Sequence, residues 1–218
     1  DIRAETVQWT NVYNGHEGMV TTGALVSPPT GDFVLMSGVG EQAGFDHSSL
    51  MSSPDLPSLW DRGMPVSVTT GIDYQEDNPN FLVRVGRRLE VGGAGTGVYS
   101  LDGGQTYTAF GAMRAGIMPY GASGGRVAIS ATSETMVWAP QNGPVVYSGN
   151  RGSAWWLGAN APSDVITGED VYTYTQPLAA DRVLGDTFYI YVEGLFYRSA
   201  DGGTTWETTA SLPVVPAD

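Results

Sequence analysis

The chain has 218 residues, with 23 acidic residues against 10 basic ones and a formal net charge of −13. A chain this acidic repels phosphate backbones and anionic headgroups, so we expect no nucleic acid and no membrane among its partners. It contains no cysteine and no lysine, which excludes disulfides, zinc–thiolate sites, cysteine nucleophiles and lysine Schiff bases.

Short apolar runs separated by turn-forming residues follow one another along the chain, which contains 30 Gly and 13 Pro. No segment carries sustained helical spacing of apolar residues. In chain order, strands are expected at 22–26, 32–36, 81–85, 126–130, 136–138, 145–147 and 187–192. Turn signals that return every eight to twelve residues or so are typical of an antiparallel all-β domain.

An internal repeat marks three places from residue 100 onward. Residues 100–107 and 199–206 share the pattern Ser-x-Asp-Gly-Gly-x-Thr-aromatic, and residues 148–155 are a degenerate copy of this pattern. The pattern resembles the Asp-box, or BNR repeat, a hairpin between the two outer strands of a propeller blade. In such a turn the Asp accepts backbone N–H bonds, the glycines adopt positive φ and the aromatic ring packs inward. We therefore expect these residues to be structural.

The spacing of the repeat predicts the architecture. Asp102, Asn150 and Asp201 follow one another at intervals of 48 and 51 residues. Such a period suits a four-stranded blade, so we predict an all-β chain of about four to five antiparallel β-propeller blades. Residues 1–218 are expected to form one partial propeller domain.

Several longer segments point to a family. They are, in order, 26–31, 36–47, 69–74, 78–86, 125–130, 137–140, 178–182 and 194–203. This series resembles the second (C-terminal) β-propeller of the glycoside hydrolase family 74 xyloglucanases, over residues 7–213. The resemblance implies two seven-bladed propellers facing across a cleft. It also implies inverting endo-cleavage of the β-1,4-glucan backbone of xyloglucan, with one catalytic Asp from each propeller.

The same resemblance assigns a catalytic position. The family's general acid in this propeller is the Asp of a Gly-Asp-Ile-Gly-Gly-Phe-like segment, and the matching segment here, 40–45, places Glu41 there. Glu is longer than Asp by roughly 1.5 Å, and a misplacement of about 1 Å can cost on the order of a hundredfold in rate. The general base belongs to the other propeller and has no match in this chain, so whether the chain is itself an enzyme stays open.

Four further residues are candidates for substrate binding. His47 follows the Glu41 segment and could orient a carboxylate or contact sugar, or it could be an ordinary loop histidine. Trp60, Tyr120 and Trp156 could stack on sugar faces, although aromatic residues in a propeller are more often core. Trp155 should be buried at its repeat position. No metal or other cofactor is expected, because two isolated His without Cys do not suit zinc.

Two functions remain open at this point. The first is part of an inverting glucanase that supplies the general-acid side. The second is a non-catalytic propeller module for carbohydrate or protein binding, or for surface assembly. Seven blades at the observed period need about 340 residues, so we expect another chain or a missing segment to complete the propeller and the cleft. The first residue is Asp1, as expected of a trimmed piece of a longer polypeptide. Polymer substrates do not cross membranes, so we expect a secreted or extracellular protein.

Overall fold

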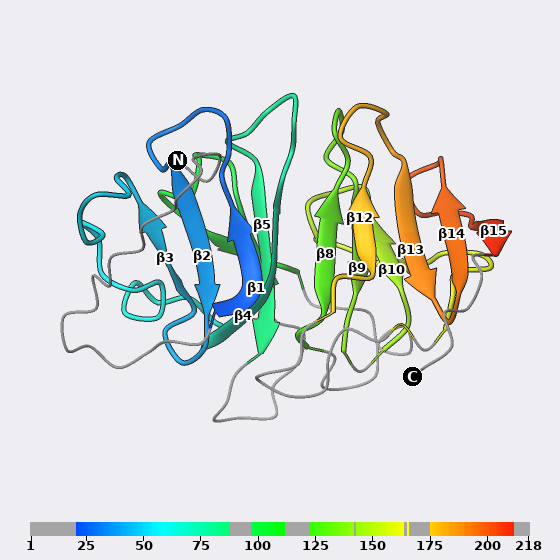
Figure 1. The fold of residues 1–218 in the computed structure, drawn as a ribbon, viewed down its shortest axis with the longest axis horizontal. Coiled ribbons are helices and arrows are strands. Elements are labelled where there is room, and N and C mark those ends of the chain that lie inside the picture. Colours follow the sequence, from blue (N-terminus) through cyan, green and yellow to red (C-terminus); the bar gives the residue numbers. More distant parts are fainter. Residues whose placement is uncertain are drawn as a thin grey trace, which may run out of the picture.

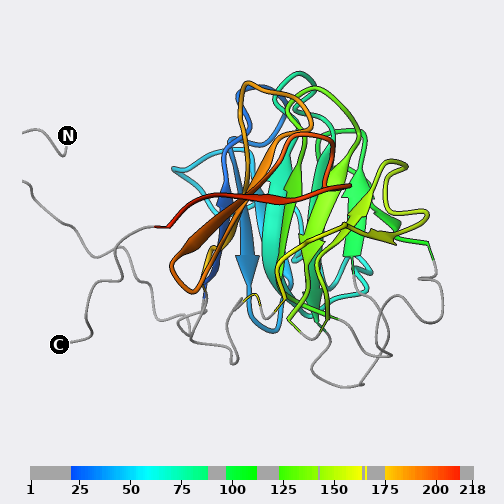
Figure 2. The same cartoon turned by 90° about the vertical axis from the view of Figure 1, so that its right-hand side faces the viewer.

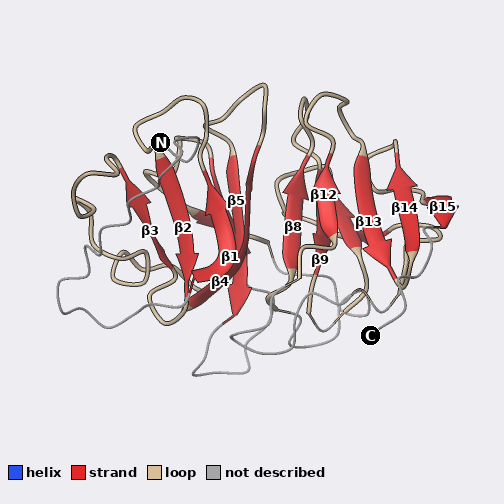
Figure 3. Cartoon of the chain, viewed as in Figure 1, coloured by secondary structure: helices blue, strands red, loops and turns tan. Residues whose placement is uncertain are grey.

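The computed structural model describes residues 21–87, 97–111, 123–141, 143–163, 165 and 175–211. These residues form fifteen strands and no helix, arranged in four antiparallel sheets (Figures 1 and 3). The all-β prediction is confirmed. In the described part of the chain there is consequently no helix with the length and apolarity needed to cross a membrane.

Each sheet is a meander of strands in chain order. The first contains β1 (Thr21–Val26), β2 (Leu35–Val39) and β3 (Gly44–His47). The second contains β4 (Val68–Tyr74), β5 (Leu82–Arg87), β6 (Gly97–Ser100) and β7 (Thr108–Ala109). The third contains β8 (Arg126–Ile129), β9 (Met136–Ala139), β10 (Val146–Ser148) and β11 (Trp156–Leu157). The fourth contains β12 (Leu178–Ala180), β13 (Phe188–Val192), β14 (Leu195–Ser199) and β15 (Glu207–Ser211).

The first strands of the four sheets lie side by side. β4 contacts both β1 and β8, and β8 also contacts β12. Figure 2, viewed from the side of the fourth sheet, shows the earlier sheets stacked behind it. Meandering sheets that fan out from adjacent first strands are the arrangement of propeller blades.

The third sheet shows why the sheets stack. Its first two strands, β8 and β9, are buried at every position. Since successive residues of a strand point to opposite faces, both faces of this sheet are covered. Val127 and Trp138 pack toward the second sheet, in a cluster with Phe81 and Val83. Ala128 and Val137, which alternate with them along the strands, pack toward the fourth sheet. They form a cluster with Leu178, Phe188 and Ile190.

The fourth sheet has a different pattern. Phe188, Ile190 and Val192 of β13 are buried against the third sheet, while Tyr189 is half-buried and Tyr191 is exposed. Buried and more exposed residues alternate along β13 because no described sheet covers the other face of the fourth sheet. In the run Phe-Tyr-Ile-Tyr-Val, the aliphatic residues and Phe188 therefore indicate the face of β13 that packs against the third sheet.

The three repeated turns share one hydrogen-bond scheme. In the first, the Ser100 hydroxyl accepts the Gly104 N–H at 2.8 Å, and Asp102 accepts the Thr106 N–H at 2.9 Å. Gly103 and Gly104 both have positive φ, of 69° and 93°. The equivalent bonds elsewhere join Gly152 to Ser148, Ala154 to Asn150, Gly203 to Ser199 and Thr205 to Asp201. Trp155 and Trp206, at the aromatic position of the last two turns, are buried.

Asp102 and Asp201 act in these turns as charged acceptors. Burial acts to raise the pKa of each carboxyl, but hydrogen bonds outweigh it and hold the pKa below its ordinary value. The bonds come from Thr106 and Ser100 on Asp102, and from Thr205 and Ser199 on Asp201. The charged form therefore stabilises the fold at pH values above the ordinary Asp pKa. This stabilisation is lost as the pH falls through the lower pKa of the folded state.

The double variant Asp102→Asn, Asp201→Asn tests this linkage. Asn keeps an acceptor oxygen, as Asn150 does in the middle turn, so the variant should fold. Its free energy of unfolding should fall less than that of the unmodified chain between about pH 6 and pH 3. Urea unfolding at the two pH values measures the difference. Asp77→Asn, at an exposed side chain, is the control, and equal pH slopes for all three proteins would contradict the assignment.

Candidate functional site

The turn between β2 and β3 carries Glu41. The Gln42 N–H donates to the Gly40 carbonyl at 2.7 Å, and the Gly44 N–H donates to the Gln42 carbonyl at 2.6 Å. These are two consecutive three-residue turns, with Glu41 and Ala43 at their centres at φ 66° and 60°. Such turns are rare and strained for residues other than glycine. The Glu41 side chain is exposed at the tip.

The strained turn is held by the segment that leads into the second sheet. The Ala43 N–H donates to the Ser67 carbonyl at 2.8 Å. The N–H groups of Leu59 and Trp60 donate to carbonyls of the turn, at 2.9 and 3.2 Å. Ala43 and Leu59 are buried in one cluster, against which Trp60 packs. Strain persists only where the surroundings over-determine the conformation, as these bonds do here.

Beneath this turn lies a buried ion pair. Asp46 on β3 accepts from Arg84 on β5 at 2.6 Å, and both side chains are fully buried. Arg62 donates to the other carboxylate oxygen at 2.9 Å. Arg84 also donates through Nη1 to the Ser37 carbonyl at 3.0 Å and through Nε to the Tyr107 hydroxyl at 2.9 Å. The group therefore joins the β2–β3 hairpin to the second sheet.

The charges of this group are fixed by their neighbours. Burial acts to lower the pKa of Arg84, but Tyr107 and Asp46 outweigh it and raise the pKa, so the guanidinium stays charged. Burial raises the pKa of Tyr107, with Arg84 opposing, so the phenol stays neutral and can accept the Arg84 N–H. Arg62 further donates to the carbonyls of Gly104 and Gln105, at 3.1 and 2.9 Å. The hairpin is thus tied to the first repeated turn as well.

The sequence reasoning did not single out Asp46, Arg84 or Arg62. A signal for Arg84 was present, since it is a charged residue inside the apolar run Phe-Leu-Val-Arg-Val. A buried cation in a strand needs a carboxylate partner. Which carboxylate that is depends on the neighbouring sheet and cannot be read from the strand.

The candidate binding residues lie in different places. Trp60 is next to the Glu41 turn through its backbone bond. His47 ends β3 opposite Leu35, at the other end of the hairpin from Glu41, with its Nε2 3.5 Å from the Ser37 hydroxyl. Trp156 is on β11 at the outer edge of the third sheet, 38% exposed, with its ring 5.9 Å from that of Tyr147. Tyr120 lies outside the described residues.

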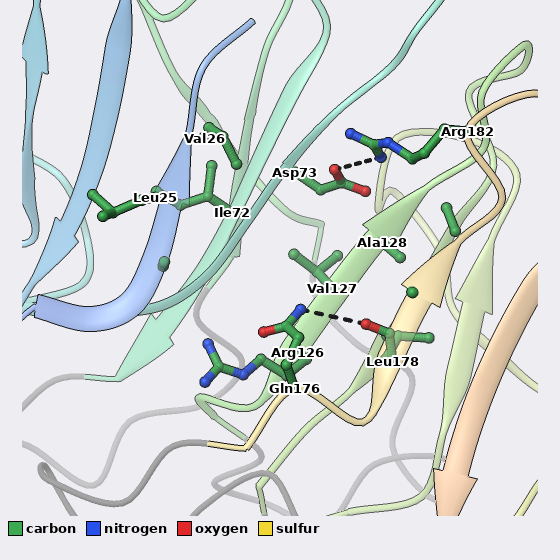
Figure 4. A pocket seen from close by; sticks show the side chains of 13 residues that line it. Leu25, Val26, Ile72, Asp73, Arg126, Val127, Ala128, Gln176, Leu178 and Arg182 are labelled. Carbon is green, nitrogen blue, oxygen red and sulfur yellow. Dashed lines mark hydrogen bonds and ion pairs between the residues drawn. The ribbon is translucent and has the colours of Figure 1, made fainter. Parts of the chain in front are cut away.

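A second ion pair crosses the inner strands (Figure 4). Arg182, just after β12, donates to Asp73 on β4 at 2.9 Å and to Glu76 at 2.7 Å. The second Asp73 oxygen accepts the Ile129 N–H at 2.8 Å. Burial raises the pKa of Asp73, and Arg182 opposes this. Asp73 and Arg182 line a cavity of about 380 Å³ together with apolar side chains of β1, β4, β8 and β12.

The structure brings no metal cluster together within its described ranges, where no three His, Asp or Glu side chains lie close enough to hold an ion. The groups at the Glu41 turn are the carboxylate of Glu41 and the Trp60 backbone N–H that bonds the turn, with the Trp60 side chain packed against the cluster that contains Ala43. A carboxylic acid on a rigid turn can donate a proton to a leaving oxygen.

Four face-packed meandering sheets with adjacent first strands define the described chain as part of a β-propeller. No protein-family model matches the chain. Individual proteins do: xyloglucanase Xgh74A of Acetivibrio thermocellus is 32% identical over 195 residues, covering 88% of this chain and 20% of that protein. The oligoxyloglucan-reducing end-specific xyloglucanase of Emericella nidulans is 28% identical over 205 residues, covering 84% and 23%.

Solved structures give the same result. The crystal structure of the GH74 xyloglucanase from Xanthomonas campestris matches 89% of this chain and 25% of its own, with a TM-score of 0.70 and 26% identity. The Niastella koreensis GH74 enzyme matches 96% and 27%, with a TM-score of 0.66 and 26% identity. The chain is therefore homologous to the glycoside hydrolase family 74 xyloglucanases over most of its length. It spans about a fifth of the length of the curated relatives it matches.

Asp46→Asn tests the ion pair under the hairpin. The substitution keeps the shape of the side chain but leaves Arg84 buried without its counter-charge. We expect the free energy of unfolding to fall by about 3–5 kcal/mol. Urea unfolding at neutral pH measures the loss. The exposed Asp77→Asn should change stability by less than about 0.5 kcal/mol, and equal effects of the two substitutions would refute the role of Asp46.

Two substitutions at Glu41 separate strain from charge. Glu41→Gly relieves the positive φ and should raise the free energy of unfolding by about 1 kcal/mol. Glu41→Gln keeps the strain and should leave stability unchanged, because the side chain is exposed. Thermal and urea unfolding measure the stability of both variants. If Glu41→Gly is no more stable than Glu41→Gln, the turn is not strained.

Proposed function

We propose that this chain supplies the general-acid side of an inverting glycoside hydrolase that cuts the β-1,4-glucan backbone of xyloglucan. The observation that carries the proposal is the homology to xyloglucanases over 88% of the chain. Glu41 is the proposed acid. Its support in the structure is the rigid, strained turn that presents it at the exposed end of the hairpin.

The proposed reaction needs two carboxyl groups. Glu41 would donate its proton to the glycosidic oxygen as the bond from that oxygen to the anomeric carbon breaks. A water molecule would attack the opposite face of that carbon and give its proton to a second carboxylate about 6.5–9.5 Å from the first. A general acid has to hold its proton at neutral pH, which burial favours. Because Glu41 is exposed, the half that brings the base would also have to cover it.

The remaining parts of the proposal follow from this assignment. Residues 1–218 form one partial propeller domain, of the second propeller type, whose repeated turns near 100–107, 148–155 and 199–206 are Asp-boxes. Another chain or a further segment completes the ring and the cleft. The partner is a xyloglucan-like β-glucan, with Trp60 next to the proposed acid, and the protein works outside the cell, where such polymers are found.

The alternative is a propeller module that binds carbohydrate or protein, or assembles at a surface, without cutting. One observation favours it: Glu41 replaces the shorter Asp of the family segment. A carbohydrate-binding module of this kind binds xyloglucan and releases nothing.

Tamarind xyloglucan distinguishes the two functions. Because the proposed base lies outside this chain, cleavage is measured as release of reducing ends without azide, and as formation of a glycosyl azide when azide is added as a nucleophile. We expect binding of the polymer, and release that Glu41→Gln lowers by at least about a hundredfold. Binding without release supports the module, and release that Glu41→Gln leaves unchanged removes Glu41 from the mechanism. Failure to bind xyloglucan contradicts the hydrolase and a xyloglucan-binding module, and favours a module that binds protein or assembles at a surface.

A further inference from the structure

The buried ion pair between the first and second sheets contains two guanidinium groups and a single carboxylate. Arg84 and Arg62 donate to the two oxygens of Asp46, at 2.6 and 2.9 Å. The Tyr107 hydroxyl that accepts the Arg84 Nε–H belongs to a neutral phenol, because burial raises the pKa of Tyr107. Arg62, Asp46 and Arg84, here called the arginine cluster, therefore carry an excess of positive charge inside a chain whose formal net charge is −13.

Arg62 is the member of the arginine cluster that reaches the surface. The side chains of Asp46 and Arg84 are fully buried, whereas that of Arg62 is 19% exposed. Its Nη1 donates to Asp46 and its Nη2 to the carbonyls of Gly104 and Gln105. A guanidinium has five N–H donors, so the Nε–H and one Nη1–H of Arg62 have no acceptor among the described residues.

The backbone fixes the position of Arg62. The Arg62 N–H donates to the Ser58 carbonyl at 3.1 Å, and the Met64 N–H donates to the Leu59 carbonyl at 3.0 Å. Leu59 and Met64 are buried in one cluster, so the short turn between them is anchored on both sides of Arg62. A ligand that bonds to this side chain does not have to order it first, which favours affinity.

A cavity of about 410 Å³ lies at Arg62, within the size range of small-molecule sites. Its described walls come from the segment before β4, from β6 and β7, and from the turn between these two strands. It therefore lies where two described sheets meet and does not arise from an end of the stack. Arg62 carries the only charge among the described lining residues, and apolar groups come from Leu59, Met64, Pro65, Val98 and Ala109.

The carboxylates of the neighbouring segments are bonded elsewhere. Asp61 accepts the Ser58 hydroxyl at 2.7 Å, and Asp32 accepts the Gln105 amide at 2.9 Å. Neither of these two carboxylates is among the described lining residues of the cavity. A ligand anion at Arg62 therefore meets no negative charge on the described wall.

We propose that this cavity binds a small monoanionic carboxylate with an apolar body, whose charged group accepts hydrogen bonds from Arg62. The carboxylate would supply the counter-charge that the arginine cluster lacks, and the apolar body would cover the apolar wall. Because most of the Arg62 side chain is buried, its attraction for an anion is screened less than that of a surface arginine. The site is independent of the proposed function, since a neutral glucan supplies no counter-charge.

Calorimetry with cinnamate and cinnamide on the full chain at neutral pH tests the ligand class. The two probes have nearly the same shape, but only cinnamate carries a charge. Cinnamate should bind at least about tenfold more tightly, as a charge-assisted hydrogen bond requires. N-acetylleucine presents its carboxylate as a peptide C-terminus does. Tighter binding of N-acetylleucine than of cinnamate identifies a chain terminus as the source of the carboxylate, and the reverse order identifies a free acid.

Substitutions at Ala109, an exposed residue of β7 on the cavity wall, test the place of binding. Ala109→Asp adds a negative charge and should weaken cinnamate binding at least about fivefold. Ala109→Asn, of the same size, is the matched control and should stay within about twofold of the unmodified chain. Both variants leave the bonds of Arg62 intact, and circular dichroism confirms that they are folded.

Arg62→Gln removes the charge itself and should lower cinnamate affinity at least about tenfold. Its stability is measured alongside, because Arg62 also bonds to Asp46. The Ala109 pair keeps the test decisive if this variant does not fold. Equal affinities for cinnamate and cinnamide overturn the proposal, as do equal affinities of the two Ala109 variants for cinnamate. A chain that binds neither cinnamate nor N-acetylleucine overturns it too.

Discussion

A middle sheet of this fold is apolar on both faces and is stable only between two neighbours. The third sheet meets this requirement, with β8 and β9 buried throughout and one cluster on each side. Burial of apolar area is the dominant stabilising contribution, so the order of the sheets follows from it. At the end of the stack of described sheets, β13 is covered on one face only. Buried and more exposed residues therefore alternate along it, and Tyr191 is exposed.

Polar interactions then fix how neighbouring sheets are joined. Asp46 and Arg84 join the first sheet to the second, and Arg182 reaches across the third sheet to Asp73 on the second. A buried ion pair stabilises little in net terms, because desolvation offsets the attraction, but its geometry is demanding. Asp46 lies in the hairpin that carries Glu41, and Arg84 reaches it and the Ser37 carbonyl from β5. The same contacts therefore support the proposed acid and join the two sheets.

The residue that we propose as the acid lies at one end of its sheet, where the backbone is strained. Glu41 and Glu193 both sit at hairpin tips with positive φ, at 66° and 48°. Hairpin tips are free of the packing that fills the sheets, so their side chains are available to a ligand. The proposed acid occupies one such tip, whereas the repeated Ser-x-Asp turns are fixed by hydrogen bonds within themselves.

The sequence by itself determined the all-β class, the antiparallel arrangement and the position of the repeated turns, because alternation, turn chemistry and the Ser-x-Asp pattern are local. It predicted seven strands of the fifteen that the described residues form, and the strand expected at 32–36 is β2 at Leu35–Val39. Only the tertiary structure decided that His47 lies at the far end of the hairpin from Glu41, that Trp60 lies beside the turn, and that Asp46 is the partner of Arg84. Each of these depends on which strands and sheets become neighbours, and contacts between residues distant in sequence leave no periodic signal in the chain.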